Sequence, residues 1–374
     1  MTFFLFFKQI VDMLYSLKWL DIVMVLLVVM MLFYQYKLTR PDLKSMICSA
    51  DIIVACLAVL VTASFIRDVS MYITYIKVMS AFLLYFMGRL YYERILECSA
   101  ALATAAYFVI CLNFFHRIFT YGISLFSVDN AFGDFYANDT EMAFAMILGF
   151  IFIGMFARKS LFKLFTMILV CPYMVIFSDA GIQMVLFAVI FVVMLMYILE
   201  VALNQKRLAM VGLGLIIVSL LAVVVLVYIP VFSGDSSRIQ SAFGWSRILS
   251  VSHMDFRYNE WNAILDQSRP TGLFENLFGL SLNTGALLRS LYLKAYYSLG
   301  IVGMVFSLAL IVRTFIAAYK GEDRKSFYVT VMTAILVLGS GVTVNSMEIL
   351  QMSWFIMLFA GMVISAEKMS PARQ

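Results

Sequence analysis

The segment 230–290 contains five arginines and no lysine: Arg238, Arg247, Arg257, Arg269 and Arg289. A guanidinium group binds phosphate through two parallel hydrogen bonds and tolerates partial burial better than an ammonium group does. Arginines gathered at a membrane surface therefore predict a site for an anionic lipid headgroup or a diphosphate. The alternative is ordinary interfacial anchoring, with the charge balanced by acids of the same segment: Asp235, Asp255, Glu260, Asp266 and Glu275.

Three candidate proton acceptors accompany these arginines, namely His253, Asp255 and Glu260. Residues 254–265 are typical of a short amphipathic helix, on which Arg257 and Trp261 lie one turn apart and share a face. A general base needs hydrogen-bonding reach to its proton and a suitable pKa. All three side chains remain candidates on that criterion.

Several motifs that would indicate other chemistry are missing from the sequence. It has neither a glycine-rich Walker loop nor an Asp-x-Asp motif, which argues against an ATPase and against a divalent ion held on a sugar nucleotide. A donor with its own membrane-anchored diphosphate, held by arginine, needs neither. The two histidines and five cysteines lack metal-site spacing, so no metal and no cofactor is expected.

The composition defines the class of protein that must position these residues. Of the 374 residues, 64% are hydrophobic and 13% are charged, whereas a soluble globular protein has about 45–50% and about 25%. This balance excludes a soluble enzyme, a nucleic-acid-binding protein and a disordered chain. It predicts an all-α fold, a polytopic integral membrane helical bundle that forms a single membrane domain over 1–374.

Eleven apolar stretches approach the length of about 20 residues that a membrane-spanning helix needs. They lie near 19–36, 46–66, 70–88, 97–115, 141–157, 161–177, 180–200, 208–229, 291–312, 326–344 and 347–365. Residues 3–17 are a candidate twelfth. There, Lys8, Asp12 and Ser16 recur every four residues opposite apolar positions, which favours a helix lying in the membrane interface over one that crosses it.

The basic residues of the short connections predict the orientation of the chain. Alternate connections contain Lys37, Arg40, Lys44, Arg89, Arg94, Arg158, Lys159, Lys163, Lys206, Arg207, Arg313, Lys320, Arg324, Lys325, Lys368 and Arg373. The opposite short connections contain only Arg67 and Arg117. Because cytoplasmic loops carry the excess of lysine and arginine, the C-terminus is expected in the cytoplasm. The segment 230–290, between the eighth and ninth spans, is then a large, partly helical periplasmic loop.

Three motifs in and after this loop resemble the O-antigen polymerase and ligase superfamily. They are Arg257-x-x-x-Trp261, then Phe274-Glu-Asn-Leu-Phe-Gly-Leu-Ser281, and then Arg289-Ser-x-Tyr-Leu followed by Gly300-Ile-Val-Gly303. Two positions depart from the family pattern. Arg289 stands where ligases of this superfamily usually have His, which favours a polymerase, and Ser178-Asp-Ala-Gly181 replaces the frequent Ser-Arg-Gly.

The resemblance implies a metal-independent glycosyltransferase in the bacterial inner membrane. It would polymerise undecaprenyl-diphosphate-linked oligosaccharide repeat units into O-antigen on the periplasmic face. Donor and acceptor would both be lipid-linked glycans, and a chain-length regulator is a candidate protein partner. Arg247, Arg257 and Arg289, with Arg238 and Arg269, would bind the diphosphates, while Glu260, Asp255 or His253 would accept the proton of the acceptor hydroxyl. Arg289 would also stabilise the charge of the leaving diphosphate.

Two other functions remain open. One is an O-antigen ligase of the same superfamily. The other is a lipid-linked oligosaccharide flippase, motivated by Lys77 inside the third predicted span and by Pro172 in the middle of the sixth. Lys77 lies near the outer end of its span, so its ammonium group could instead extend to the interface.

Overall fold

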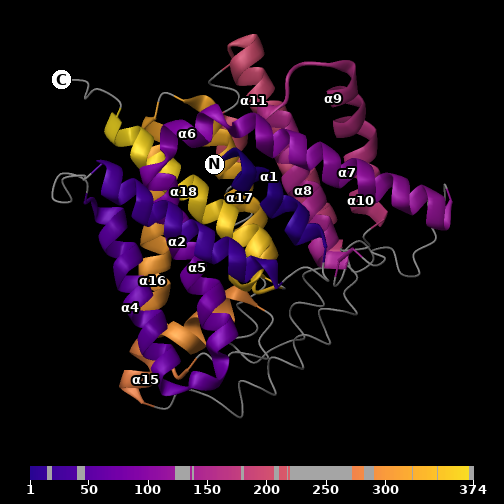
Figure 1. Ribbon diagram of the computed structural model, residues 1–374. Helices are drawn as coiled ribbons and strands as arrows, with labels where there is room; N and C mark the ends of the chain where they lie inside the picture. Colours follow the sequence, from indigo (N-terminus) through magenta and orange to yellow (C-terminus); the bar gives the residue numbers. More distant parts are fainter. Residues whose placement is uncertain are drawn as a thin grey trace.

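The computed structural model describes residues 1–14, 19–39, 47–122, 135–136, 139–177, 181–205, 210–216, 218–219, 272–281, 290–321, 323–342 and 344–369. Every regular element within these ranges is a helix (Figure 1). A helix forms all of its backbone hydrogen bonds within one segment, which lipid requires. The helical architecture therefore follows from the apolar composition.

Seven helices of the described part are long and apolar enough to cross a membrane. They are α2 (Leu20–Thr39), α4 (Ser49–Arg67), α5 (Tyr72–Leu90), α7 (Ser99–Tyr121), α11 (Gly181–Leu203), α16 (Leu291–Lys320) and α18 (Leu350–Met369). By helix length and hydropathy the chain is a multi-pass membrane protein.

The other predicted spans have different outcomes. Two shorter apolar helices, within 140–156 and 161–176, occupy the fifth and sixth predicted spans. The first is α8 (Asp139–Phe156), and the second comprises α9 (Leu161–Phe165), a π-helical turn and α10 (Cys171–Phe177). The 17-residue helix α17 (Arg324–Ser340) occupies the tenth. Of the eighth, 208–229, only 210–216 and 218–219 are described.

Helix α18 is the central helix of the bundle. Within its apolar window 78% of the residues are buried, compared with 17% in α2. Glycines on both partners allow α18 to approach α5 closely. A Cβ atom at Gly88 would collide with the carbonyl oxygen of Leu358, and one at Gly361 with that of Tyr85. Small residues at crossing points are how membrane helices bring their backbones together.

Three arginines of the basic connections that the structure describes lie at one end of the bundle, which we name the basic face. There Arg89 of α5 pairs with an aspartate of α4, Arg313 of α16 with a glutamate of α18, and Arg324 of α17 with a glutamate of α11. In Figure 1 this end carries α6 (Tyr92–Glu97) and the end of α18, and α15 (Leu273–Phe278) lies at the other end, the opposite face. The alternation predicted from the sequence therefore holds for these connections.

Within the predicted interfacial segment 3–17, the described residues form a helix whose charged side is buried in the bundle. Helix α1 (Thr2–Met13) packs against α7, α2 and α8 and buries its charged side, with Lys8 1% and Asp12 6% exposed, while Phe3 is 59% exposed. The charges are satisfied internally, since Lys8 pairs with Asp12 and, at 3.0 Å, with Asp21. Twelve helical residues extend about 18 Å, which is too short to cross a bilayer core of about 30 Å.

Candidate functional site

The residues that the sequence predicts for catalysis and diphosphate binding lie outside the described ranges. These are Arg238, Arg247, His253, Asp255, Arg257, Glu260, Arg269 and Arg289. Their roles stay predictions. The structure does describe two segments next to these residues in the sequence. They are residues 272–281 and the start of α16, at the opposite face.

The two glycine motifs of the predicted site pack against each other, backbone to backbone. Gly279 has φ +75° and Gly300 has φ +68°, a region that favours glycine. A Cβ atom at Gly279 would lie 2.5 Å from the carbonyl carbon of Ser298, and one at Gly300 would collide with the backbone of Leu277 and Gly279. Gly300 also interrupts α16. The segment after α15 therefore docks into a break in a long membrane helix.

Hydrogen bonds from outside α16 satisfy carbonyl groups next to this break. The amide of Leu280 donates to the carbonyl oxygen of Tyr297 at 2.7 Å. The hydroxyl of Ser64, in α4, donates to the carbonyl oxygen of Ser298 at 2.8 Å. Irregular backbone within membrane helices is tolerated where protein groups replace the lost bonds. Helix α4 and the 272–281 segment together stabilise the interrupted helix.

Arg67, at the end of α4, fixes the docked segment from its other side. Its Nη1 donates to the carbonyl oxygens of Gly279 at 2.5 Å and Leu280 at 3.0 Å. Its guanidinium carbon lies 5.3 Å from the centre of the Phe274 ring, a cation–π contact. An exposed arginine therefore lies beside the described segment 272–281 of the predicted loop.

The start of α16 is anchored to the connection between α17 and α18. The Ser290 side chain caps α16 and donates to the carbonyl oxygen of Gly341 at 3.3 Å, and the amide of Leu291 donates to the same oxygen at 2.8 Å. Ser290 follows the predicted Arg289 directly in the sequence. These hydrogen bonds hold Ser290, the residue next to Arg289, on both α16 and the end of α17.

One buried ion pair at this face was not among the predicted site residues. Lys294 of α16 pairs with Glu348 of the short 3₁₀ helix Ser346–Glu348 that precedes α18. Both lie inside apolar stretches predicted to span the membrane, so the signal for each was its ionisable side chain within a span. Their pairing, 54 positions apart, could not be read from local spacing.

Lys77 and Pro172, which motivated the flippase hypothesis, both lie within described helices. Lys77 is half-buried in α5, and its carbonyl oxygen accepts a bond from Ser80 at 2.7 Å. Pro172 follows a π-helical turn over 166–170, and the helix continues to Phe177. A π turn beside a proline is a common source of a helix bend.

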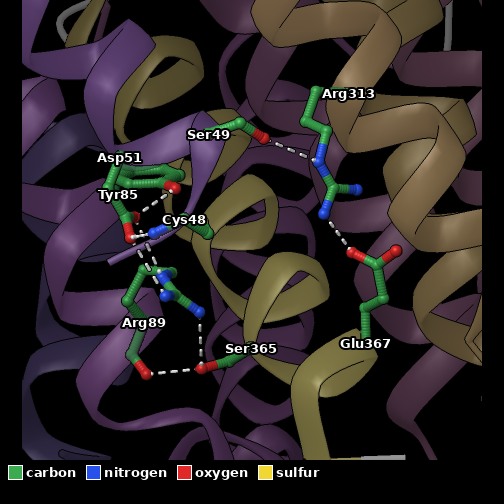
Figure 2. Close-up of polar contacts among 8 residues, drawn as sticks. All are labelled: Cys48, Ser49, Asp51, Tyr85, Arg89, Arg313, Ser365 and Glu367. Atoms are coloured by element: carbon green, nitrogen blue, oxygen red, sulfur yellow. Dashed lines mark hydrogen bonds and ion pairs between the residues drawn. The ribbon is translucent and has the colours of Figure 1, made fainter. Parts of the chain in front are cut away.

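The basic face holds a second polar cluster, which is closed on itself. Figure 2 shows Arg89 between Asp51 and Ser365, and Arg313 between Ser49 and Glu367. Two guanidinium nitrogens of Arg89 each lie 3.1 Å from a different carboxylate oxygen of Asp51. The carboxylate also accepts from the Tyr85 hydroxyl at 2.7 Å and from the Cys48 amide at 2.9 Å. This arrangement ties helices together.

Neither cluster resembles a metal centre. Across the residues that the structure describes, no group of three or more His, Cys, Asp and Glu side chains is arranged to hold a metal ion. Comparison of the chain with models of known protein families and with curated proteins found no match.

Proposed function

We propose that the chain is a glycosyltransferase that polymerises undecaprenyl-diphosphate-linked oligosaccharide repeat units into O-antigen. The observation that carries the proposal is the docking of the 272–281 segment onto the break at Gly300. Two of the three motifs behind the resemblance to the O-antigen polymerase and ligase superfamily meet there. Their glycines serve one purpose, which is to let two backbones touch.

The proposed site lies on the periplasmic side of the bacterial inner membrane. Both faces have polar side chains, and the excess of lysine and arginine on the basic face favours the cytoplasm for that end. The opposite face, with α15 and the start of α16, is then periplasmic. In the full proposal the chain has eleven spans, a cytoplasmic C-terminus and its long loop over 230–290.

Arginine supplies the main catalytic effect in this proposal. When the donor sugar is transferred, its undecaprenyl diphosphate departs with a growing negative charge. Fixed guanidinium donors stabilise such charge more in the transition state than in the ground state. Arg247, Arg257 and Arg289 are proposed to hold the diphosphates, and Glu260, Asp255 or His253 to accept the acceptor proton.

Deletion of the gene, with surface polysaccharide compared by gel electrophoresis, tests the function. A polymerase deletion leaves a single repeat unit on the lipid core and removes the ladder of longer chains. Complementation by the wild-type gene should restore the ladder, and Arg289→Ala at an equal membrane level should not. Full activity of Arg289→Ala would remove that residue from the site.

The same gel separates the competing functions. If bare core remains while long chains accumulate on undecaprenyl diphosphate, the protein is a ligase. If single lipid-linked repeats accumulate facing the cytoplasm, it is a flippase. The flippase has one observation in its favour, the interruption of α16 at Gly300, because transporters often build their sites from discontinuous helices.

A further inference from the structure

The Lys294–Glu348 ion pair lies inside the described bundle and is not among the residues assigned to the proposed function. The Lys294 side chain is 7% exposed and that of Glu348 is 25% exposed. Moving an ion pair out of water adds little net stability, and apolar residues of similar volume often do as well or better. An ionisable pair inside the bundle is therefore a candidate for function.

The position of the pair connects it to the proposed site. The amide of Lys294 donates to the carbonyl oxygen of Ser290 at 3.0 Å, so Lys294 lies one turn from the residue that follows Arg289. On the next turn, the hydroxyl of Tyr296 donates to Asn276 at 2.6 Å, which holds α15. The first turns of α16 thus connect the docked loop segment on one side with Glu348 on the other.

The two partners differ in access. The Lys294 side chain is enclosed by the bundle. Glu348 belongs to a three-residue 3₁₀ helix, and a quarter of its side-chain surface is exposed. An approaching hydroxyl could therefore reach Glu348 but not Lys294. The ammonium group of Lys294 would hold the carboxylate in its orientation through their ion pair.

We infer that Glu348, in place of Glu260, Asp255 or His253, is the proton acceptor for the acceptor sugar, with Lys294 as its positioning residue. This role rests on the proposed polymerase function. The Glu348 carboxylate takes the proton of the acceptor hydroxyl as that oxygen bonds to the anomeric carbon of the donor. The bond from the anomeric carbon to the diphosphate breaks, and its electron pair leaves with undecaprenyl diphosphate.

Turnover by the purified full-length protein in lipid nanodiscs tests this role. The substrate is the lipid-linked repeat unit extracted from the deletion strain. Glu348→Gln keeps the shape of the side chain and should lower kcat about 10²- to 10⁴-fold, the usual contribution of a general base, with an unchanged KM. Glu348→Asp should recover part of the loss. Glu367→Gln, which breaks a matched ion pair at the basic face, should keep the wild-type kcat.

Two further outcomes distinguish failure of this inference from failure of the proposed function. Wild-type turnover in Glu348→Gln, or in the apolar double variant Lys294→Met/Glu348→Leu, would overturn the inference and leave the pair a structural contact. Failure of the wild-type protein itself to extend the lipid-linked units would instead overturn the proposed function, and this role with it.

Discussion

The two faces of the bundle use arginine in opposite ways. At the basic face, Arg89 is 6% exposed and donates to the Asp51 carboxylate. That carboxylate also accepts hydrogen bonds from other groups, including the Tyr85 hydroxyl. At the opposite face, Arg67 is exposed, and its described hydrogen bonds go to the backbone carbonyl oxygens of Gly279 and Leu280. The first arrangement neutralises a charge and fixes helices, whereas the second holds a loop and leaves a positive charge at the surface.

This difference decides which face has charge available to a ligand. A buried charge with a saturated partner has no capacity for a ligand, so the Arg89 cluster is a structural tie. The opposite face combines a broken helix, a docked loop segment, an exposed arginine and a partly exposed glutamate. Such a face can offer charge to an anionic substrate, because Arg67 is exposed and Glu348 is partly exposed.

The largest expected effect is on stability at the basic face. Arg89→Met leaves the Asp51 carboxylate buried without its cation, which should lower the free energy of unfolding by about 3–5 kcal/mol. Thermal denaturation of the detergent-solubilised protein, followed by size-exclusion chromatography, measures the loss. The double variant Asp51→Asn/Arg89→Met should recover part of it. A single variant as stable as wild type would show that this cluster does not tie the helices.

A smaller effect is expected at the break in α16. Gly300→Ala places a side chain where φ is +68° and ψ is −170°, a strain of about 1–3 kcal/mol, and its Cβ meets the backbone of Leu277 and Gly279. The segment 272–281 should separate from α16 and exchange its amide hydrogens faster, while exchange at the basic face stays unchanged. Gly214→Ala, with nothing within 4 Å of the added Cβ, is the control. Equal exchange at 272–281 in wild type and Gly300→Ala would contradict the docking.

The smallest effect is expected at Arg67. Arg67→Met removes two hydrogen bonds of an exposed side chain, so the loss should be about 1 kcal/mol. Faster amide exchange confined to the segment after α15 would detect it. Ser49→Ala, which removes one exposed contact of Arg313 at the basic face, is the matched control. A loss as large as that of Arg89→Met would end the distinction between the two faces.

Local properties of the chain predicted much of the fold. Runs of apolar residues predicted the seven helices that are long enough to cross a membrane. The sequence positions of Arg89, Arg313 and Arg324 predicted their shared face. Both predictions depend on residues close together in the sequence. The inward charged side of α1 could not be predicted in this way. Lys8 and Asp12 recur at a helical spacing that fits either a solvent-exposed or a buried helix face. The face is buried because Lys8 contacts Asp21 and Trp354, which lie far from it in the sequence.

The candidate site was predictable to a lesser extent. The sequence singled out Gly279, Gly300 and their motifs, but not that the two glycines touch, because that contact depends on a break in α16. Lys294 and Glu348 were each visible as ionisable residues in apolar stretches. Their pairing depends on how α16 and α18 pack, which is a property of the tertiary structure.

The buried end of α1 has a consequence for the assembly of the protein in the membrane. The ammonium group of Lys8 lies 4.4 Å from the centre of the Trp354 ring, and Gln351 donates to the carbonyl oxygen of Asp12 at 2.9 Å. Because α18 is synthesised after the other described helices, the charges of α1 remain incompletely enclosed until α18 inserts. Chains truncated before α18 should therefore be recognised by membrane quality-control proteases at their N-terminal end, far from the missing residues.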